Sequence, residues 1–228
     1  MLSPCSRGGI GDSEAMAYYV GLDLGQSADF TALAVVQSVK ERGEAGNLET
    51  FLHLRHLERY PLRTPYTTIA AGVGALMRSQ ALNADEHDAA RGRVAKPKVE
   101  LLVDKTGVGR GVTDILKERG LRFTGVVIHG GETVHHSDGA YHVPKKDLVA
   151  ALEVPFDAER LKVAEGLELW GMLKEELQSF RRKQNPKTSH VSFEHWRESD
   201  HDDLVLAAAL ACWGVTGRRG RRTLRVIR

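Results

Sequence analysis

The sequence has little cysteine, no long apolar run and no internal repeat. Its two cysteines, Cys5 and Cys212, have no partner at the spacing of a metal site or a disulfide framework, which favours a reduced, intracellular setting. The longest smooth apolar stretch, residues 204–215, is shorter than the roughly 20 residues that span a bilayer, so no membrane segment is predicted.

The sequence also lacks a strong excess of either charge, because the formal net charge is only +2 and the pI is near 8.5. That balance is too mild to indicate nucleic-acid binding by itself. The basic residues are unevenly distributed, however, and residues 217–228 contain six arginines and no acid. This tail is either a solvated end or an arm that contacts phosphates. The phosphate-contacting residues would be Arg218, Arg219, Arg221 and Arg222.

The length and composition predict one principal domain. The chain has 228 residues, of which 42% are hydrophobic, enough for one sizeable core. The first residues are rich in Gly and Ser and lack the apolar core of a signal peptide. We therefore expect a disordered leader over residues 1–16, a folded domain over 17–216 and a basic tail over 217–228.

Hydrophobic patterning predicts an α/β domain. Three apolar segments in succession, separated by polar connections, predict an antiparallel meander over residues 18–24, 30–39 and 49–60. A later strand, helix and strand predict a parallel unit with a right-handed crossover, over residues 99–104, 112–119 and 123–129. Further predictions are a helix over 66–82, a loop or ribbon over 129–142, a helix starting near 143–148, a short strand over 160–164, a helix over 167–180, a strand over 191–196 and an alanine-rich helix over 204–214.

Acidic residues stand at the ends of three of these elements. Asp23 ends the first strand, Asp104 ends a later one, and Asp202 and Asp203 precede the last helix. Singly, each has an ordinary explanation, because Asp often starts a turn and acids in a first helical turn gain roughly 0.3–1 kcal/mol from the helix dipole. If the strands of Asp23 and Asp104 pair in parallel, however, both carboxylates emerge at one sheet end, on strands about 4.8 Å apart.

Carboxylates this close repel each other unless a cation lies between them. Oxygen ligands without nearby cysteine are those that Mg²⁺ or Mn²⁺ prefers. Two such ions roughly 3.5–4 Å apart can activate a water molecule and stabilise the leaving oxygen of a phosphodiester. Adjacent helical residues point about 100° apart. We therefore expect Asp203 to be the inner ligand and Asp202 to be a second ligand or a helix-capping acid.

Four segments in order resemble the nuclease domain of the large terminase subunit of tailed bacteriophages. They are GLDLGQSADFTA at 21–32, VDKTGVG at 103–109, VPKKDL at 143–148 and HDDLVLA at 201–207. The resemblance covers roughly residues 18–214. It implies a ribonuclease H-like fold, with a central five-stranded mixed sheet, made of an antiparallel meander plus parallel strands and flanked by helices.

The resemblance also implies an activity. Domains of that family cut concatemeric double-stranded viral DNA with two divalent ions, Mg²⁺ or Mn²⁺, held by acids that match Asp23, Asp104, Asp202 and Asp203. It implies location in the cytoplasm of a bacterial host. This chain has no Gly-x-x-x-x-Gly-Lys-Ser/Thr loop and lacks the length for the family's ATPase motor. A separate terminase ATPase, a small terminase subunit and a portal are therefore the candidate partners besides DNA.

Three lysines near the acids, Lys105, Lys145 and Lys146, are candidates for contact with the DNA backbone, the alternative for each being a solvated surface position. Two other functions stay open. One is an actin-like or sugar-kinase-type nucleotide-binding domain, whose phosphate hairpin also reads Asp-x-Gly, as Asp23 to Gly25 does. The other is a catalytically silent DNA-binding module of the same fold. The acid pair on the last helix favours the nuclease over the nucleotide-binding domain.

Overall fold

The antiparallel meander predicted for the first part of the chain is present. In the computed structural model, β1 (Ala17–Asp23) pairs with β2 (Thr31–Arg42), and β2 pairs with β3 (Leu48–Tyr60), both antiparallel. The first seven residues of β2 are all buried. This fits a central strand covered on both faces, which is apolar along its length and does not alternate.

The second half of the sheet is parallel. The strand β6 (Lys98–Asp104) lies parallel to β1, and β7 (Thr124–His129) lies parallel to β6. The helix α3 (Arg110–Glu118) connects β6 to β7, as predicted for a parallel crossover. This order places β1 between its hairpin partner β2 and the parallel strand β6, so the Asp23 strand is central.

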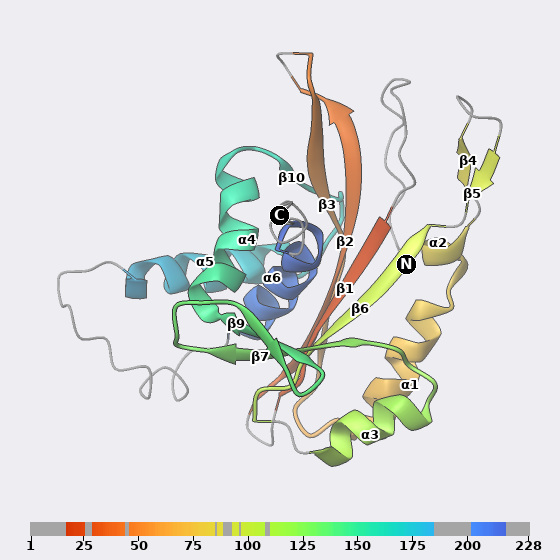
Figure 1. Cartoon of the computed structure of the whole chain (residues 1–228), viewed down its shortest axis with the longest axis vertical. Helices are drawn as coiled ribbons and strands as arrows, with labels where there is room; N and C mark the ends of the chain where they lie inside the picture. Colours follow the sequence, from red (N-terminus) through yellow and green to blue (C-terminus); the bar gives the residue numbers. More distant parts are fainter. Residues whose placement is uncertain are drawn as a thin grey trace, which may run out of the picture.

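The described residues form an eight-stranded sheet in the order β10-β3-β2-β1-β6-β7-β9-β8 (Figure 1). The predicted five strands are its centre, and three more extend the edges. β9 (Ala140–Pro144) joins β7 in parallel, β8 (His135–Ser137) pairs with β9, and β10 (Leu161–Val163) pairs with β3. Strands of three to five residues show little alternation, which is why residues 129–142 predicted only a loop or ribbon.

Helices cover both faces of this sheet (Figure 1). One face carries α4 (Lys145–Asp157), α5 (Trp170–Gln184) and α6 (Asp203–Thr216). The other carries α1 (Tyr66–Met77) and α3. The helix predicted over 66–82 is interrupted, because α1 ends at Met77 and a short helix, α2 (Gln80–Asn83), follows. A separate small hairpin pairs β4 (Glu86–Asp88) with β5 (Arg93–Ala95).

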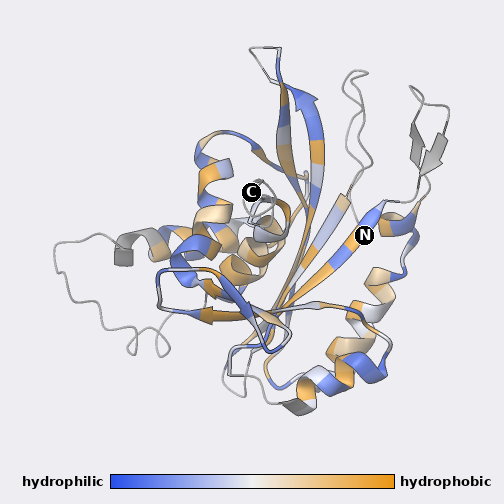
Figure 2. Ribbon diagram, viewed as in Figure 1, coloured by the Kyte–Doolittle hydropathy of each residue, from blue (hydrophilic) through white to orange (hydrophobic). Residues whose placement is uncertain are grey.

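The helix α6 lies directly on the central strands. Every residue from Asp203 to Val215 is buried, and most of α6 is apolar in Figure 2. A side chain at Gly21 of β1 would overlap the carbonyl oxygen of Ala207 and the amide nitrogen of Ala211, so the glycine is what allows this close approach. The glycine thus allows α6 to pack closely against β1 two residues before Asp23.

The structure describes residues 17–25, 29–43, 46–84, 86–88, 93–95, 97–107, 110–184 and 202–217. The predicted leader, the strand over 191–196 and the tail arginines lie outside these residues. Within the described part of the chain, no helix combines the length and the apolar character needed to cross a membrane.

Candidate active site

Asp23 and Asp104 end two adjacent parallel strands. Leu22 pairs with Val103 in the register, so the two aspartates follow side by side. In both strands the residue two positions earlier, Gly21 in β1 or Leu102 in β6, faces α6. Because side chains alternate along a strand, both carboxylates point to the α6 face. The exposed fractions are only 7% for Asp23 and 6% for Asp104.

The first turn of α6 brings the other two predicted acids to the same place. Asp203 is the first residue of α6 and is buried, and Asp202 precedes it at the N-cap position. Asp23 experiences the charges of Asp104, Asp203 and Asp202, in that order of strength. The other three predicted acids therefore lie near enough to act electrostatically on Asp23, and the four together are called the acid cluster below.

Crowding and burial change the acidity of this cluster. The pKa of Asp23 is raised well above its ordinary value, first by burial and then by the three neighbouring carboxylates, while Lys145 acts in the opposite direction. Burial raises the pKa of Asp104 to about 6, and hydrogen bonds from Thr106 partly offset this rise. The cluster therefore holds more negative charge than its surroundings stabilise.

Thr106 orients Asp104. Its backbone N–H and its hydroxyl both donate to Oδ1 of Asp104, at 2.7 and 2.5 Å. The same hydroxyl accepts a hydrogen bond from the backbone N–H of Ile128 in β7, at 2.7 Å. Because the threonine is fixed from both sides, Oδ1 of Asp104 is held in place.

Two cations pair with the acids of α6. Lys145, the first residue of α4, donates to Oδ2 of Asp202 at 2.7 Å. Arg59, next to the end of β3, donates to Oδ2 of Asp203 at 3.0 Å. The Asp202 side chain makes no capping hydrogen bond, so of the two predicted roles for Asp202 the helix-capping one is absent.

The donor set fits a hard divalent cation. All four predicted ligands are carboxylates, the oxygen donors that such a cation prefers. Burial raises the pKa of Asp23 and of Asp104, and for Asp23 the neighbouring carboxylates raise it further. Among the described residues, no three His, Cys, Asp or Glu side chains already converge tightly enough to hold a metal ion. Asp202 and Asp203 are instead held by their ion pairs with Lys145 and Arg59.

The predicted DNA-binding residues lie in different surroundings. Lys145 is only 16% exposed and belongs to the acid cluster. Lys146 is half exposed and pairs with Glu132. The stem of Lys105 lies against Gly125 of β7, which has no side chain to displace it. The four tail arginines are outside the described residues, so DNA contact stays a prediction for all of these positions.

Two residues of the site were not predicted. Arg59 pairs with Asp203, and Glu176 of α5 accepts hydrogen bonds from the first turn of α6. Burial raises the pKa of Glu176 to about 7, partly offset by the N–H of Val205 and by Arg59. A signal for each was present, because Arg59 follows the core residue Leu57 by two positions in a strand, and Glu176 falls on the apolar face of its helix.

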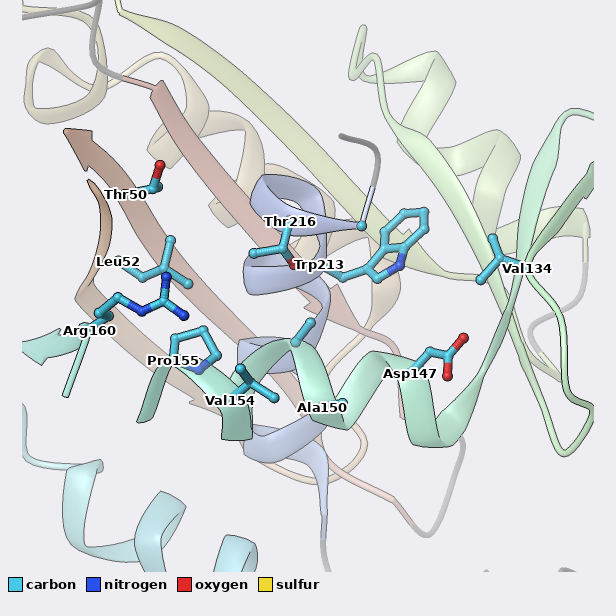
Figure 3. Close-up of a pocket in the computed structure, with 12 residues that line it drawn as sticks. Thr50, Leu52, Val134, Asp147, Ala150, Val154, Pro155, Arg160, Trp213 and Thr216 are labelled. Carbon is cyan, nitrogen blue, oxygen red and sulfur yellow. The ribbon is translucent and has the colours of Figure 1, made fainter. Parts of the chain in front are cut away.

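A pocket of about 380 Å³ lies at the opposite end of α6 from these acids (Figure 3). Its lining includes Leu52 of β3, Val154 of α4 and Trp213 of α6. Asp23, Asp104, Asp202 and Asp203 are not among its lining residues. The pocket is thus separate from the acid cluster.

The strand order and the two helical layers define an α/β fold of the ribonuclease H-like class, as the resemblance to terminase nucleases implied. The structure is similar to that of the large terminase nuclease from the thermophilic phage G20c. The two chains are 17% identical, the match covers 94% of this chain and 92% of that one, and the TM-score is 0.52. At this identity the likeness establishes the fold.

Two further solved structures are similar at lower scores. The Mn-soaked human cytomegalovirus terminase nuclease domain has a TM-score of 0.49 at 13% identity, over 90% of this chain and 88% of that one. RuvC from Thermus thermophilus has a TM-score of 0.34 at 15% identity, over 90% and 97%. No protein-family model and no curated protein sequence matches the chain.

Proposed function

We propose that this chain is a divalent-metal-dependent endodeoxyribonuclease that cuts double-stranded DNA for a phage or prophage packaging terminase. One observation carries the proposal. Four carboxylates from three separated parts of the chain, Asp23, Asp104 and the pair Asp202 and Asp203, meet where β1 and β6 end. The similarity in fold to a phage terminase nuclease supports the same function.

In this proposal Asp23, Asp104 and Asp203 hold two Mg²⁺ or Mn²⁺ ions, with Asp202 as a further ligand. When bound, the ions supply activation of a water molecule and charge stabilisation at the phosphodiester. The chain's own residues prepare the site. Thr106 fixes one oxygen of Asp104, and Lys145 limits the repulsion among the acids and keeps Asp202 in place.

Substrate contact is proposed for the basic residues around the cluster. In this proposal Lys105 and Lys146 contact the DNA backbone, and Lys145 does so if it leaves Asp202. The tail arginines would add sequence-independent affinity through phosphate contacts. The proposed partners are double-stranded DNA, a terminase ATPase, the small terminase subunit and the portal.

A second candidate is a DNA-binding module of the same fold that does not cleave. It is favoured by the ion pairs of Asp202 with Lys145 and of Asp203 with Arg59, and by the lack of a ready metal-binding group among the described residues. The nucleotide-binding alternative finds no such support, since a nucleotide clamp does not require acids at the start of α6 beside Asp23.

Incubation of the purified chain with supercoiled plasmid in Mn²⁺, Mg²⁺ or EDTA tests the proposal. We expect metal-dependent cleavage that disappears in Asp23→Ala and in Asp104→Ala. The matched control is Asp114→Ala, which removes an exposed acid of α3 that pairs with Lys117 and should cleave like the wild type.

The outcomes separate the candidates. DNA binding without cleavage in any metal supports the silent module. Cleavage that persists in both aspartate variants removes these acids from the mechanism.

A further inference from the structure

The first turn of α6 lacks a cap of its own. The first N–H groups of a helix have no partner within it and are usually satisfied by the side chain at the N-cap. Here the N-cap residue, Asp202, makes no such bond and its carboxylate pairs with Lys145. The acids of α6 would therefore lie on a fraying turn unless another element supplied acceptors.

Glu176 of α5 supplies them. Its Oε2 accepts hydrogen bonds from the backbone N–H groups of Leu204 and Val205, at 3.1 and 3.2 Å. Glu176 is 9% exposed, and both bonds are buried. A carboxylate at this position also interacts favourably with the positive end of the helix dipole. A residue 28 positions earlier in the chain thus caps the helix that carries Asp203.

Arg59 ties the same turn to the sheet. Its Nη2 donates to Asp203, and its Nη1 lies 3.8 Å from Oε1 of Glu176. The guanidinium is itself fixed, because it stacks 3.8 Å from the ring centroid of Phe30 and Nη1 donates to the sulfur of Met172 at 2.8 Å. The planar fork of arginine can hold two acids on two helices at once, which the point charge of a lysine cannot do.

We propose that Arg59 and Glu176 are a pair of positioning residues that fix the first turn of α6, so that Asp203 and Asp202 present their carboxylates to the acid cluster. The inference rests on the proposed nuclease function for its purpose. In this proposal neither residue touches the scissile phosphate. Both act through the acids, as the partners that orient metal ligands do.

Two near-isosteric variants of the full chain test the pair. Glu176→Gln keeps an oxygen that can accept the two N–H groups, and Glu176→Ala does not. Arg59→Lys keeps a positive charge beside Asp203 and loses the planar guanidinium. The side-chain cation that competes with a metal ion for Asp203 is therefore still present. The matched control is Glu175→Ala, which removes an exposed acid from the adjacent position of α5.

Two readouts are measured on each variant. The first is amide hydrogen exchange at Leu204 and Val205 in EDTA, which needs no metal and no activity. We expect at least a tenfold faster exchange in Glu176→Ala and wild-type protection in Glu176→Gln and Glu175→Ala. The second is Mn²⁺ affinity by calorimetry, alongside plasmid cleavage. Because loss of an orienting partner typically costs about 10–100-fold in metal affinity, we expect that loss in Glu176→Ala and in Arg59→Lys.

A merely structural role would lower the melting temperature and leave the Mn²⁺ affinity of the folded protein unchanged. Unchanged affinity in Arg59→Lys together with Glu176→Ala therefore overturns the proposal, as does unchanged exchange in Glu176→Ala. If Glu176→Ala does not fold, Arg59→Lys decides alone. If the wild type neither binds Mn²⁺ nor cleaves DNA, the nuclease function fails. Faster amide exchange at Leu204 and Val205 in Glu176→Ala would then show that Glu176 caps α6, and the proposal that it positions metal ligands would be rejected.

Discussion

Replacing Asp104 with asparagine should make the metal-free protein more stable while abolishing cleavage. The amide oxygen of asparagine can still accept both hydrogen bonds from Thr106, so the local geometry is kept. The substitution removes a buried negative charge and one of the charges that raise the pKa of Asp23. Stability and function should therefore change in opposite directions at this position.

The size of the effect follows from the acidity of Asp104. Its pKa rises from 3.8 to about 6 on folding, because burial disfavours the charged form. A group whose pKa is raised on folding stabilises the native state at low pH, and that contribution is lost as the pH rises from about 4 to about 6. At about 1.4 kcal/mol for each pKa unit, the cost in the wild type at pH 8 is up to about 3 kcal/mol.

The assay is thermal unfolding in EDTA at pH 8 and again at pH 4. A gain of up to about 3 kcal/mol corresponds to a melting temperature up to roughly 10 °C higher for a domain of this size. The gain should shrink strongly at pH 4, where the native wild type carries a protonated Asp104. Mn²⁺ should raise the melting temperature of the wild type more than that of the variant, since Asp104 is a proposed ligand.

Asp114→Asn is the matched control, because Asp114 is exposed and a surface change of this kind is expected to stay within about 0.5 kcal/mol. Equal stability of Asp104→Asn and wild type at pH 8, or the same gain at both pH values, would refute the reasoning that the acid cluster is under electrostatic strain.

Three further predictions concern the surroundings of the cluster. Gly21→Ala should lower the free energy of unfolding by about 1–3 kcal/mol or more, because the new methyl group overlaps α6. Denaturant titration measures this loss. The control is Gly171→Ala, whose new methyl group has no atom within 4 Å and should leave the stability nearly unchanged. Thr106→Val removes a donor that lowers the pKa of Asp104, so the pH of half-maximal cleavage should move upward, and an unmoved acid limb of the pH–rate profile would contradict it. Deletion of residues 218–228 should reduce the salt dependence of DNA binding, by a slope of about 0.9 for each phosphate that the tail neutralises in the full chain, and a slope equal to that of the full chain would reject the phosphate-arm role.

The sequence alone determined the centre of the fold and the meeting of two acids. One apolar run ends in Asp23 and a second ends in Asp104, and the resemblance to terminase nucleases implied that these two strands are neighbours. If such strands pair in parallel, their carboxyl ends lie at one edge of the sheet, so the two aspartates come close together. The structure shows this pairing.

Local pattern predicted one edge of the sheet and not the other. β10 falls within the short strand predicted over residues 160–164. β8 and β9 are three and five residues long, and each is defined by the hydrogen bonds of its neighbour and not by its own periodicity. The histidines and glycines between β7 and α4 give no sign that β9 continues the parallel sheet. Such strands form because a longer strand with free backbone groups lies beside them.

The contacts that hold the last helix were decided only by the tertiary structure. From the sequence, Asp202 and Asp203 are two acids in a first helical turn, and either can cap the helix or face the cluster. Packing of α5 against α6 brings in Glu176, which takes the capping positions, and the end of β3 brings in Arg59, which takes one oxygen of Asp203. These contacts join residues 28 to 144 positions apart, so no local pattern could specify them. The sequence determined which acids are present at the ends of the strands and of the helix, and the three-dimensional packing determined how each one is held.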